Sequence, residues 1–282
     1  MVSAMRRVLV TGMSGLIGTA VRRRLEGRFA LRALNRRPVA GVECHQADIG
    51  DLAAIAPAFD GVDAVVHLAA NVAANPPVDA IVRDNVVGTY NVFTAARHAG
   101  VKNLVWASSE SVLGLPFDDP PPYLPVDEEV PLRPNSSYSL GKDLEEEMAR
   151  QLCRRDPTLK MIGLRFSNVM VPADYEQFPG FDADPGIRRW NLWSYIDARD
   201  AAQAVRRALE HDATGTDVFI IANADTVMSR PTAELAAEAF PDVPVRKELG
   251  RNETLLSIDK ARRVLGYEPV HSWRAGAVPA RD

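Results

Sequence analysis

The chain contains little cysteine, no excess of basic residues and no apolar run of membrane-spanning length. Its two cysteines, Cys44 and Cys153, lie far apart without metal-ligand neighbours, which argues against a disulfide framework or a metal site. The 33 Lys and Arg residues are outnumbered by 37 Asp and Glu, and the net charge of -4 gives no basic footprint for nucleic acid. The apolar stretch near the N-terminus is too short for a signal peptide. We therefore expect a cytoplasmic protein with no metal, nucleic-acid or membrane partner.

What the chain does contain is a regular alternation of short apolar runs and helical patterns over its first 165 residues or so. This alternation predicts an α/β fold with a doubly wound, Rossmann-type parallel sheet. The expected strands are 8–10, 29–34, 42–47, 62–70, 102–107, 161–166 and 218–222. The expected helices are 16–25, 78–99, 136–155, 195–209, 232–239 and 259–265, and the expected loops are 71–77, 116–134 and 168–193.

This pattern also divides the chain into two expected parts. Residues 1–167 form the dinucleotide-binding Rossmann domain, to which residues 195–222 return. Residues 168–194 and 223–282 form a small C-terminal cap that binds substrate. Metal ligands are expected in neither part.

Three glycines follow the first predicted strand and open the first predicted helix. Gly12 allows a sharp turn, Gly15 leaves room where a pyrophosphate must approach the backbone, and Gly18 lets the helix pack close to the strand. The free amides at the start of that helix face an anion. Glycines also serve as plain turn residues, but a strand before and a helix after favour dinucleotide binding.

Tyr138 and Lys142 lie four residues apart in the long helix 136–155, and therefore share one helix face. A lysine cation nearby favours the phenolate of a tyrosine, which can then exchange a proton with a substrate hydroxyl near neutral pH. The strand 102–107 carries Ser109 to the carboxyl edge of the sheet, where it can donate a hydrogen bond to a substrate oxygen. The alternatives are that Tyr138 and Lys142 are ordinary surface residues and that the serines only form a turn or cap in the chain.

Several short motifs resemble, in order and spacing, those of the extended short-chain dehydrogenase/reductase family, often called the NAD-dependent epimerase/dehydratase family. The resemblance covers about the first 170 residues and reappears near Asp197. The motifs are Thr11-Gly12-x-x-Gly15-x-x-Gly18, Asp48-Ile49, His67-Leu68-Ala69-Ala70, Asn85-Val86-Val87-Gly88-Thr89, Ser108-Ser109-x-x-Val112-x-Gly114, Tyr138-x-x-x-Lys142, Arg165-Phe166-Ser167-Asn168 and Tyr195-Ile196-Asp197.

The resemblance implies hydride transfer between a nicotinamide dinucleotide and a secondary alcohol carbon. It implies that Ser109, Tyr138 and Lys142 are catalytic, that Lys142 also binds the nicotinamide ribose, and that Asp48 contacts adenine. The expected substrate contacts are Ser109, Ser111, Arg165 and Asn168. The expected cofactor contacts are Gly12, Ser14, Gly15, Leu16, Ile17, Gly18, Asn35, Arg36, Arg37, Asp48, Ile49, Leu68, Ala69, Ala70, Asn85, Tyr138 and Lys142.

The choice between NAD and NADP depends on the end of the second predicted strand. An NAD-binding member carries an acidic residue there, which holds the ribose 2′-hydroxyl. This chain has Asn35 followed by Arg36 and Arg37, which suits a 2′-phosphate and favours NADP slightly over NAD. The alternative is a solvated turn.

The substrate is expected to be a small sugar-like molecule, because the C-terminal lobe is short compared with members that act on nucleotide sugars. Arg165, Arg188 or Arg189 can pair with a carboxylate, as in a uronate, or form ordinary ion pairs. Trp190 and Trp193 can stack on a sugar ring or pack in the core.

The expected function is therefore that of an NAD(P)-dependent oxidoreductase acting on a secondary or anomeric alcohol or carbonyl of a sugar-like molecule, with a uronate as one candidate. Dehydration is disfavoured, because the acidic pair of dehydrating relatives is half missing at Glu110 and Ser111. The alternatives are a nucleotide-sugar epimerase with tightly bound NAD and a non-catalytic protein that senses the cofactor. By resemblance, a homodimer paired through helices 78–99 and 136–155 is expected.

Overall fold

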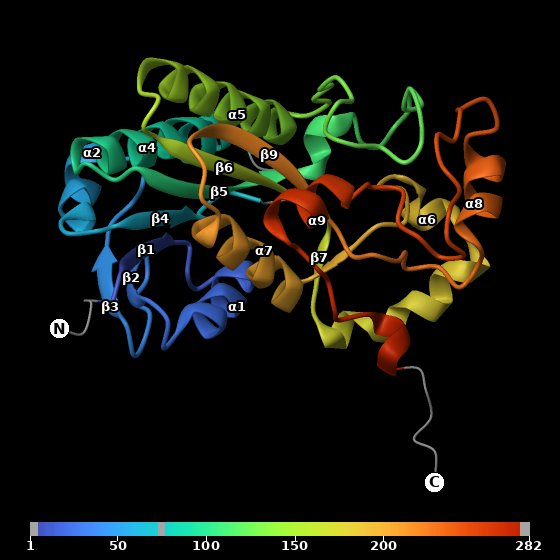
Figure 1. Ribbon diagram of the computed structural model, residues 1–282, viewed down its shortest axis with the longest axis horizontal. Helices are drawn as coiled ribbons and strands as arrows, with labels where there is room; N and C mark the ends of the chain where they lie inside the picture. Colours follow the sequence, from blue (N-terminus) through green and yellow to red (C-terminus); the bar gives the residue numbers. More distant parts are fainter. Residues whose placement is uncertain (1–4, 73–76, 277–282) are drawn as a thin grey trace, which may run out of the picture.

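The computed structural model describes residues 5–72 and 77–276, and its centre is a seven-stranded parallel sheet (Figure 1). The strand order is β3-β2-β1-β4-β5-β6-β9, so the chain moves outward in one direction from β1 and then in the other from β4. Ligands bind at such a switch point, beyond the carboxyl ends of the strands. The strands are β1 (Arg7–Thr11), β2 (Ala30–Asn35), β3 (Glu43–Gln46), β4 (Ala64–His67), β5 (Asn103–Ser109), β6 (Lys160–Phe166) and β9 (Gly215–Ile221).

Helices cover both faces of this sheet, which is why its central strands are apolar on both sides. Val8 and Val10 of β1 pack toward α1 (Leu16–Leu25) and α7 (Ala198–Glu210). Leu9, between them, points to the opposite core with α2 (Leu52–Ile55), η1 (Ala56–Phe59), α4 (Gly88–His98) and α5 (Ser137–Arg155). The predicted Rossmann-type fold is confirmed.

The predicted helix 78–99 exists but is not uniform. It begins as α3 (Val78–Ile81), widens into the π-helical turn η2 (Val82–Val87), and continues as α4. Asn85 lies in the wide turn and binds the backbone of Asn71, accepting from its amide and donating to its carbonyl. Such π turns are frequent at functional sites. Of the predicted loop 71–77, residues 73–76 lie outside the described residues.

The prediction of an irregular loop over 168–193 is wrong, because this segment contains short ordered elements. They are β7 (Val169–Met170), η4 (Pro172–Ala183) and α6 (Gly186–Arg189), and β7 pairs with β8 (Ile196–Asp197). Because Ile196 and Asp197 form this strand, α7 begins at Ala198 and not at Tyr195. Together with α8 (Thr232–Ala239), α9 (Asp259–Leu265) and η5 (Trp273–Gly276), these elements surround the carboxyl edge of the sheet.

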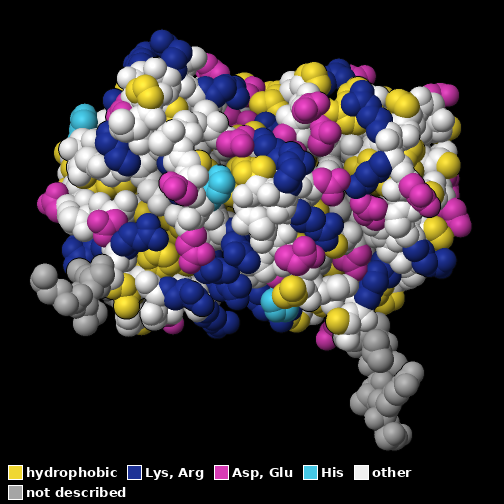
Figure 2. All heavy atoms as spheres, viewed as in Figure 1, with side chains coloured by type: hydrophobic (Ala, Val, Ile, Leu, Met, Phe, Trp, Pro, Cys, Tyr) yellow, Lys and Arg dark blue, Asp and Glu magenta, His cyan; other side chains and the backbone are white. Residues whose placement is uncertain are grey.

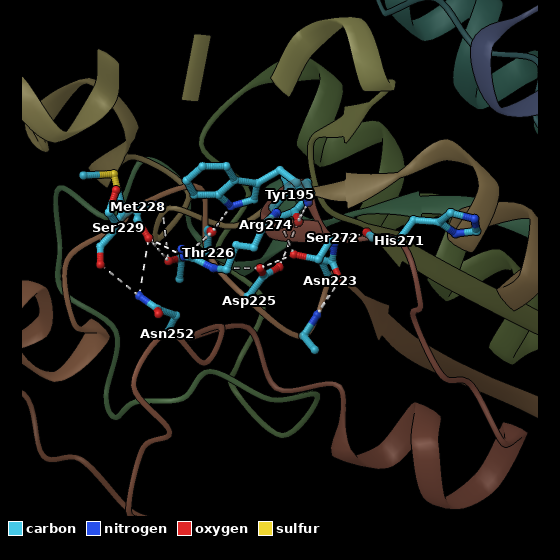
Figure 3. Close-up of polar contacts among 12 residues, drawn as sticks. Tyr195, Asn223, Asp225, Thr226, Met228, Ser229, Asn252, His271, Ser272 and Arg274 are labelled. Carbon is cyan, nitrogen blue, oxygen red and sulfur yellow. Dashed lines mark hydrogen bonds and ion pairs between the residues drawn. The ribbon is translucent and has the colours of Figure 1, made fainter. Parts of the chain in front are cut away.

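Asp225 ties the last turn of the chain to the segment before α7 (Figure 3). Its carboxylate accepts hydrogen bonds from Tyr195 Oη at 2.8 Å and Ser272 Oγ at 2.6 Å, and it pairs with Arg274 Nε at 3.0 Å. The indole of Trp273 donates to the carbonyl of Thr226. The C-terminal turn is thus fixed to residues far away in the sequence.

On the face drawn in Figure 2, basic and acidic side chains are interspersed, and basic ones gather below the centre, over α1 and α7. Arg22 of α1 and Arg206 of α7 form ion pairs with Glu26 and Glu210. Among the described residues, no helix is both long and apolar enough to cross a membrane.

Candidate active site

Two adjoining cavities open at the carboxyl edge of the sheet. The smaller has a volume of about 210 Å³ and lies over the ends of β2 and β3, and the larger, of about 790 Å³, lies over β5 and β6. They share four lining residues, namely Gly12, Gly15, Leu68 and Ala70. One elongated ligand can therefore extend across the glycine-rich turn from one cavity into the other.

The glycine-rich turn has no room for side chains. Gly12 has φ +69°, and a Cβ there would lie 2.7 Å from the amide nitrogen of Ala69. A Cβ on Gly18 would lie 2.3 Å from the carbonyl oxygen of Gly12, so only glycine lets α1 approach β1 this closely. No side chain caps the start of α1 at Gly15, which leaves its first amides available to an anion.

The smaller cavity is lined by Asn35, Arg36 and Arg37 at the end of β2 and by Asp48 and Ile49 after β3. The Asn35 side chain is already engaged, because Oδ1 accepts from the Met13 amide and Nδ2 donates to Ser14 Oγ. Both arginines are exposed. This end of the cavity presents cations and no carboxylate at the position where an NAD-binding member carries one.

Ser109, at the end of β5, lines the larger cavity together with Tyr138 and Lys142 of α5. Ser136 caps α5 through a reciprocal pair of hydrogen bonds with Ser139, which places Tyr138 in the first turn. Lys142 Nζ lies 5.8 Å from the centre of the Tyr138 ring and donates to the carbonyl of Ala107 at 2.9 Å. Ser109 Oγ accepts from the amide and hydroxyl of Ser111, so its own proton is available to a ligand.

Lys142 is buried, and its ammonium forms an ion pair with Glu145, one turn further along α5. Both carboxylate oxygens of Glu145 lie 3.0–3.1 Å from Nζ, and both side chains are almost fully shielded from solvent. Burial is the largest single effect and works to lower the pKa of Lys142. The charges of Glu145, Tyr138 and Glu146 and the hydrogen bonds to Glu145 together outweigh it, and the pKa is raised. The ammonium is therefore kept charged inside the protein.

The structure also places most of the other predicted contacts at the two cavities. Ser111 and Asn168 line the larger one, and Asn168 Oδ1 accepts from Arg188 at 2.9 Å. The remaining predicted cofactor residues, other than Asn85, line one cavity or both: Gly12, Ser14, Gly15, Leu16, Ile17, Gly18, Asn35, Arg36, Arg37, Asp48, Ile49, Leu68, Ala69, Ala70, Tyr138 and Lys142.

Arg165 and Asn85 do not line either cavity. Arg165 points into the core between β6 and α5, where its guanidinium forms two hydrogen bonds with the buried carboxylate of Glu146. Glu146 also accepts from Ser108. A buried arginine that already has a carboxylate partner is not free for a substrate, so Arg165 supports the core and does not reach the cavity.

The two tryptophans of the 186–194 segment differ in their surroundings. Trp190 lines the larger cavity and is 37% exposed. Trp193 is buried, with its ring edge against Phe240 and its indole N–H donated to the carbonyl of Pro185. Trp193 is thus a core residue, and Trp190 is the one available to a ligand.

Glu110 follows Ser109 and is the one carboxylate among the described residues that line the larger cavity. Burial raises its pKa to about 7, against the opposing effects of Ser167, Asn191 and Arg188. Asn191 donates to Glu110 Oε1 at 3.2 Å. This carboxyl therefore changes charge near neutral pH.

Sequence reasoning missed Glu145 and the apolar wall formed by Val72, Leu115 and Pro116. For Glu145 there was a signal: Glu145 and Glu146 follow Lys142 at helical spacings that place both carboxylates on the inner face of α5. The apolar wall has no pattern that separates it from any other loop. Among residues 5–72 and 77–276, no group of three His, Cys, Asp or Glu side chains is placed to hold a metal ion.

The residues present fit a nicotinamide dinucleotide. The glycine turn leaves space that a Cβ would fill, uncapped amides face an anion, and the adjoining cavity brings a hydroxyl, a phenol and an ammonium together. When bound, such a group supplies a hydride acceptor or donor. The protein groups can bind an alcohol or carbonyl oxygen and move its proton.

Comparisons with known proteins agree with this geometry. The sequence model of the NAD dependent epimerase/dehydratase family matches residues 8–222. An L-arabinose 1-dehydrogenase (NAD(P)(+)) from Haloferax volcanii is 26% identical over 275 residues, which cover 94% of this chain and 96% of that one. A uronate dehydrogenase from Agrobacterium fabrum is 35% identical over 155 residues, which cover 52% of this chain and 55% of that one.

Among solved structures, a short-chain dehydrogenase/reductase superfamily protein from Agrobacterium tumefaciens with bound NAD is similar at a TM-score of 0.74. It is 27% identical, and the match covers 95% of this chain and 94% of that one. A match of the family's sequence model to most of the chain, with this sheet and this glycine turn, shows that the chain belongs to the NAD-dependent epimerase/dehydratase family of extended short-chain dehydrogenases/reductases.

Proposed function

We propose that this enzyme transfers hydride between a nicotinamide dinucleotide and a secondary or anomeric alcohol carbon of a free sugar. The observation that carries the proposal is the meeting of Ser109, Tyr138 and Lys142 in one cavity that adjoins the glycine-rich turn. Tyr138 takes the alcohol proton during oxidation and returns it during reduction. Ser109 donates a hydrogen bond to the reacting oxygen, and the Lys142 cation favours the phenolate form of Tyr138.

Relatives that act on unactivated sugars support this substrate class. The L-arabinose 1-dehydrogenase matches nearly the whole chain, and the uronate dehydrogenase matches about half of it. We place a neutral aldose ahead of a uronate, because the described residues lining the larger cavity include Glu110 and no arginine. We propose residues 168–194 and the described part of 223–282 as the substrate-binding part. From the first of these ranges, Asn168, Val169 and Trp190 line the larger cavity, and Trp190 offers an aromatic face to a sugar ring.

The test is a cofactor-reduction assay of the purified enzyme with NAD and with NADP, against neutral aldoses, uronates and nucleotide sugars. We expect stoichiometric reduction of one cofactor by a free aldose. Tyr138→Phe should lower kcat about 100-fold or more, the usual range for losing a general acid or base, while the dissociation constant of the cofactor changes little.

Other outcomes of this assay would indicate a different function. Tightly bound cofactor, with interconversion of a nucleotide sugar and no net reduction, would indicate an epimerase. Cofactor binding without turnover of any substrate would indicate a sensor. Full activity of Tyr138→Phe would overturn the assignment of the proton to Tyr138.

We propose NADP as the preferred cofactor. Asn35 uses both ends of its side-chain amide to hold Met13 and Ser14, while Arg36 and Arg37 line the smaller cavity and are exposed. Two guanidinium groups that form no ion pair among the described residues suit a 2′-phosphate.

We propose a homodimer that buries the outer surface of η2, α4 and α5. Five large apolar side chains there are 42–53% exposed, and they are Val82, Val87, Tyr90, Leu140 and Leu144. In light-scattering measurements the wild type should have twice the chain mass, and Val87→Glu with Leu144→Glu should be monomeric. Val270→Glu, which adds a charge at another exposed apolar site, should leave the dimer intact. A monomeric wild type would refute the proposal.

A further inference from the structure

A continuous chain of buried hydrogen bonds connects Lys142 to the end of β1. The amides of Leu68 and Ala69 both donate to Thr11 Oγ1, at 3.2 and 3.1 Å. Thr11 Oγ1 also lies 2.7 Å from His67 Nδ1. Since the Thr11 oxygen accepts two amide protons, its own proton is donated to Nδ1.

This assignment fixes the direction of the rest of the chain. With Nδ1 accepting, the neutral imidazole of His67 carries its proton on Nε2 and donates it to Thr89 Oγ1 at 2.9 Å. The Thr89 hydroxyl is then left to donate to Glu145, with which it interacts. His67 remains neutral, because burial and the Lys142 charge lower its pKa to about 3.

Glu145 is therefore where two sets of donors meet. Thr89 reaches it from α4, and the Lys142 ammonium reaches it from the preceding turn of α5. The other charged groups nearby are Glu146, which is paired with Arg165 of β6, and Tyr138. Of the two buried carboxylates, Glu145 is thus the one that contacts the Lys142 ammonium directly.

We propose that Glu145 is a positioning residue for the Tyr138 and Lys142 pair: it holds the buried ammonium in place and sets the pH at which the pair releases its proton. This inference rests on the proposed roles of Tyr138 and Lys142. Removing the negative charge makes loss of a proton easier from both groups, since each is then left in a more positive surrounding. The effect falls on both members of the pair, and both line the larger cavity.

The test is an ultraviolet titration of tyrosinate in the cofactor-free protein, which needs no substrate. The Tyr138 signal is the difference between the wild type and Tyr138→Phe, and the same difference is measured in the Glu145→Gln background. We expect the midpoint to fall by about one pH unit in Glu145→Gln, the effect of a unit charge several ångströms away at an effective dielectric constant of about 20. Glu147→Gln, which removes an exposed charge from the same helix, should leave the midpoint in place. An unchanged or raised midpoint in Glu145→Gln overturns the proposal.

The pH profile of kcat/KM supplies a second readout once a substrate is known. Both limbs should move to lower pH in Glu145→Gln, whereas a merely structural role would lower activity equally at every pH. A shifted tyrosinate midpoint in a protein without dehydrogenase activity would uphold this inference and refute the proposed function.

Glu145→Gln leaves the buried Lys142 ammonium without its carboxylate partner, which destabilises the fold, and the variant can unfold. The wild type then provides the test by carbon NMR of its lysine side chains, with the Lys142 signal identified by its loss in Lys142→Met. Lys142 should stay charged to a higher pH than exposed lysines do. Loss of its proton below their range would show that Glu145 supplies no effective counter-charge, and would overturn the proposal.

Discussion

At the scale of single residues, the binding partner of an arginine decides whether that arginine lines the smaller cavity or supports the core. Arg36 and Arg37 have exposed guanidinium groups at the smaller cavity, whereas Arg165 is buried against Glu146. The sequence alone treats these arginines as equals, because a carboxylate partner 19 positions away in another element leaves no local pattern.

Replacing both exposed arginines, Arg36→Gln with Arg37→Gln, should weaken NADP binding about 10- to 100-fold. This range corresponds to losing charge-assisted hydrogen bonds of about 1.5–3 kcal/mol in total. Binding of NAD should change little, so the ratio of the two dissociation constants, measured by calorimetry, is the readout. Arg23→Gln, an exposed arginine on α1 outside both cavities, is the matched control. An unaltered ratio would mean that neither arginine meets the 2′-phosphate.

At the scale of elements, the sequence predicts best where a helix stands alone with a clear start and stop. The bounds of α1, α8 and α9 agree with the predicted 16–25, 232–239 and 259–265. The predicted strand 62–70 is longer than β4, because its last three residues leave the sheet to line the cavities. The prediction for residues 168–193 was wrong because 3-10 turns and two-residue strands produce no helical or strand periodicity of apolar residues.

A substitution at Gly18 would show how closely α1 must approach β1. A Cβ there would meet the carbonyl oxygen of Gly12 at 2.3 Å and the backbone of Met13 at 2.7 Å, and backbone atoms cannot rotate away. Gly18→Ala should therefore lower the free energy of unfolding by about 1–3 kcal/mol and weaken cofactor binding, because the turn itself is displaced. Denaturant titration and calorimetry would measure the two effects. Gly180→Ala, where a Cβ meets nothing within 4 Å, should alter stability by less than about 0.5 kcal/mol.

At the scale of the whole molecule, a buried polar cluster around Glu110 joins the end of β5 to residues 188–194. The carboxyl lies at the end of β5 and receives the amide of Asn191, which also donates to the carbonyl of Ser194. Arg188 donates to Asn168 and to the same carbonyl. Protonation of Glu110 is thus linked to the packing of residues 188–194 against the end of β5.

This linkage predicts how stability depends on pH. The pKa of Glu110 is raised from 4.5 when unfolded to about 7 when folded, so between these values the folded state holds a proton that the unfolded state has lost. The contribution of this group to the free energy of unfolding is largest below pH 4.5 and falls by about 3 kcal/mol as the pH rises to 7. Glu110→Gln should remove this fall, which denaturant titrations of both proteins at pH 5 and pH 7 would measure. If the free energy of unfolding falls equally in the wild type and in Glu110→Gln between pH 5 and pH 7, Glu110 is already ionised in the folded state at pH 5.

The contacts of Asp225 with the turn at residues 272–274 join segments that are synthesised at different times. Tyr195, which packs beside Phe178, contacts Trp273 and Asp225, and Asp225 in turn binds Ser272 and Arg274. On a ribosome the segment around Tyr195 emerges about thirty residues before Asp225 and about eighty residues before Ser272, Trp273 and Arg274. By then every described residue that lines either cavity has been synthesised, the last of them being Trp190. A nascent chain thus contains the residues of both cavities before the contacts that fix the segment around Tyr195 can form.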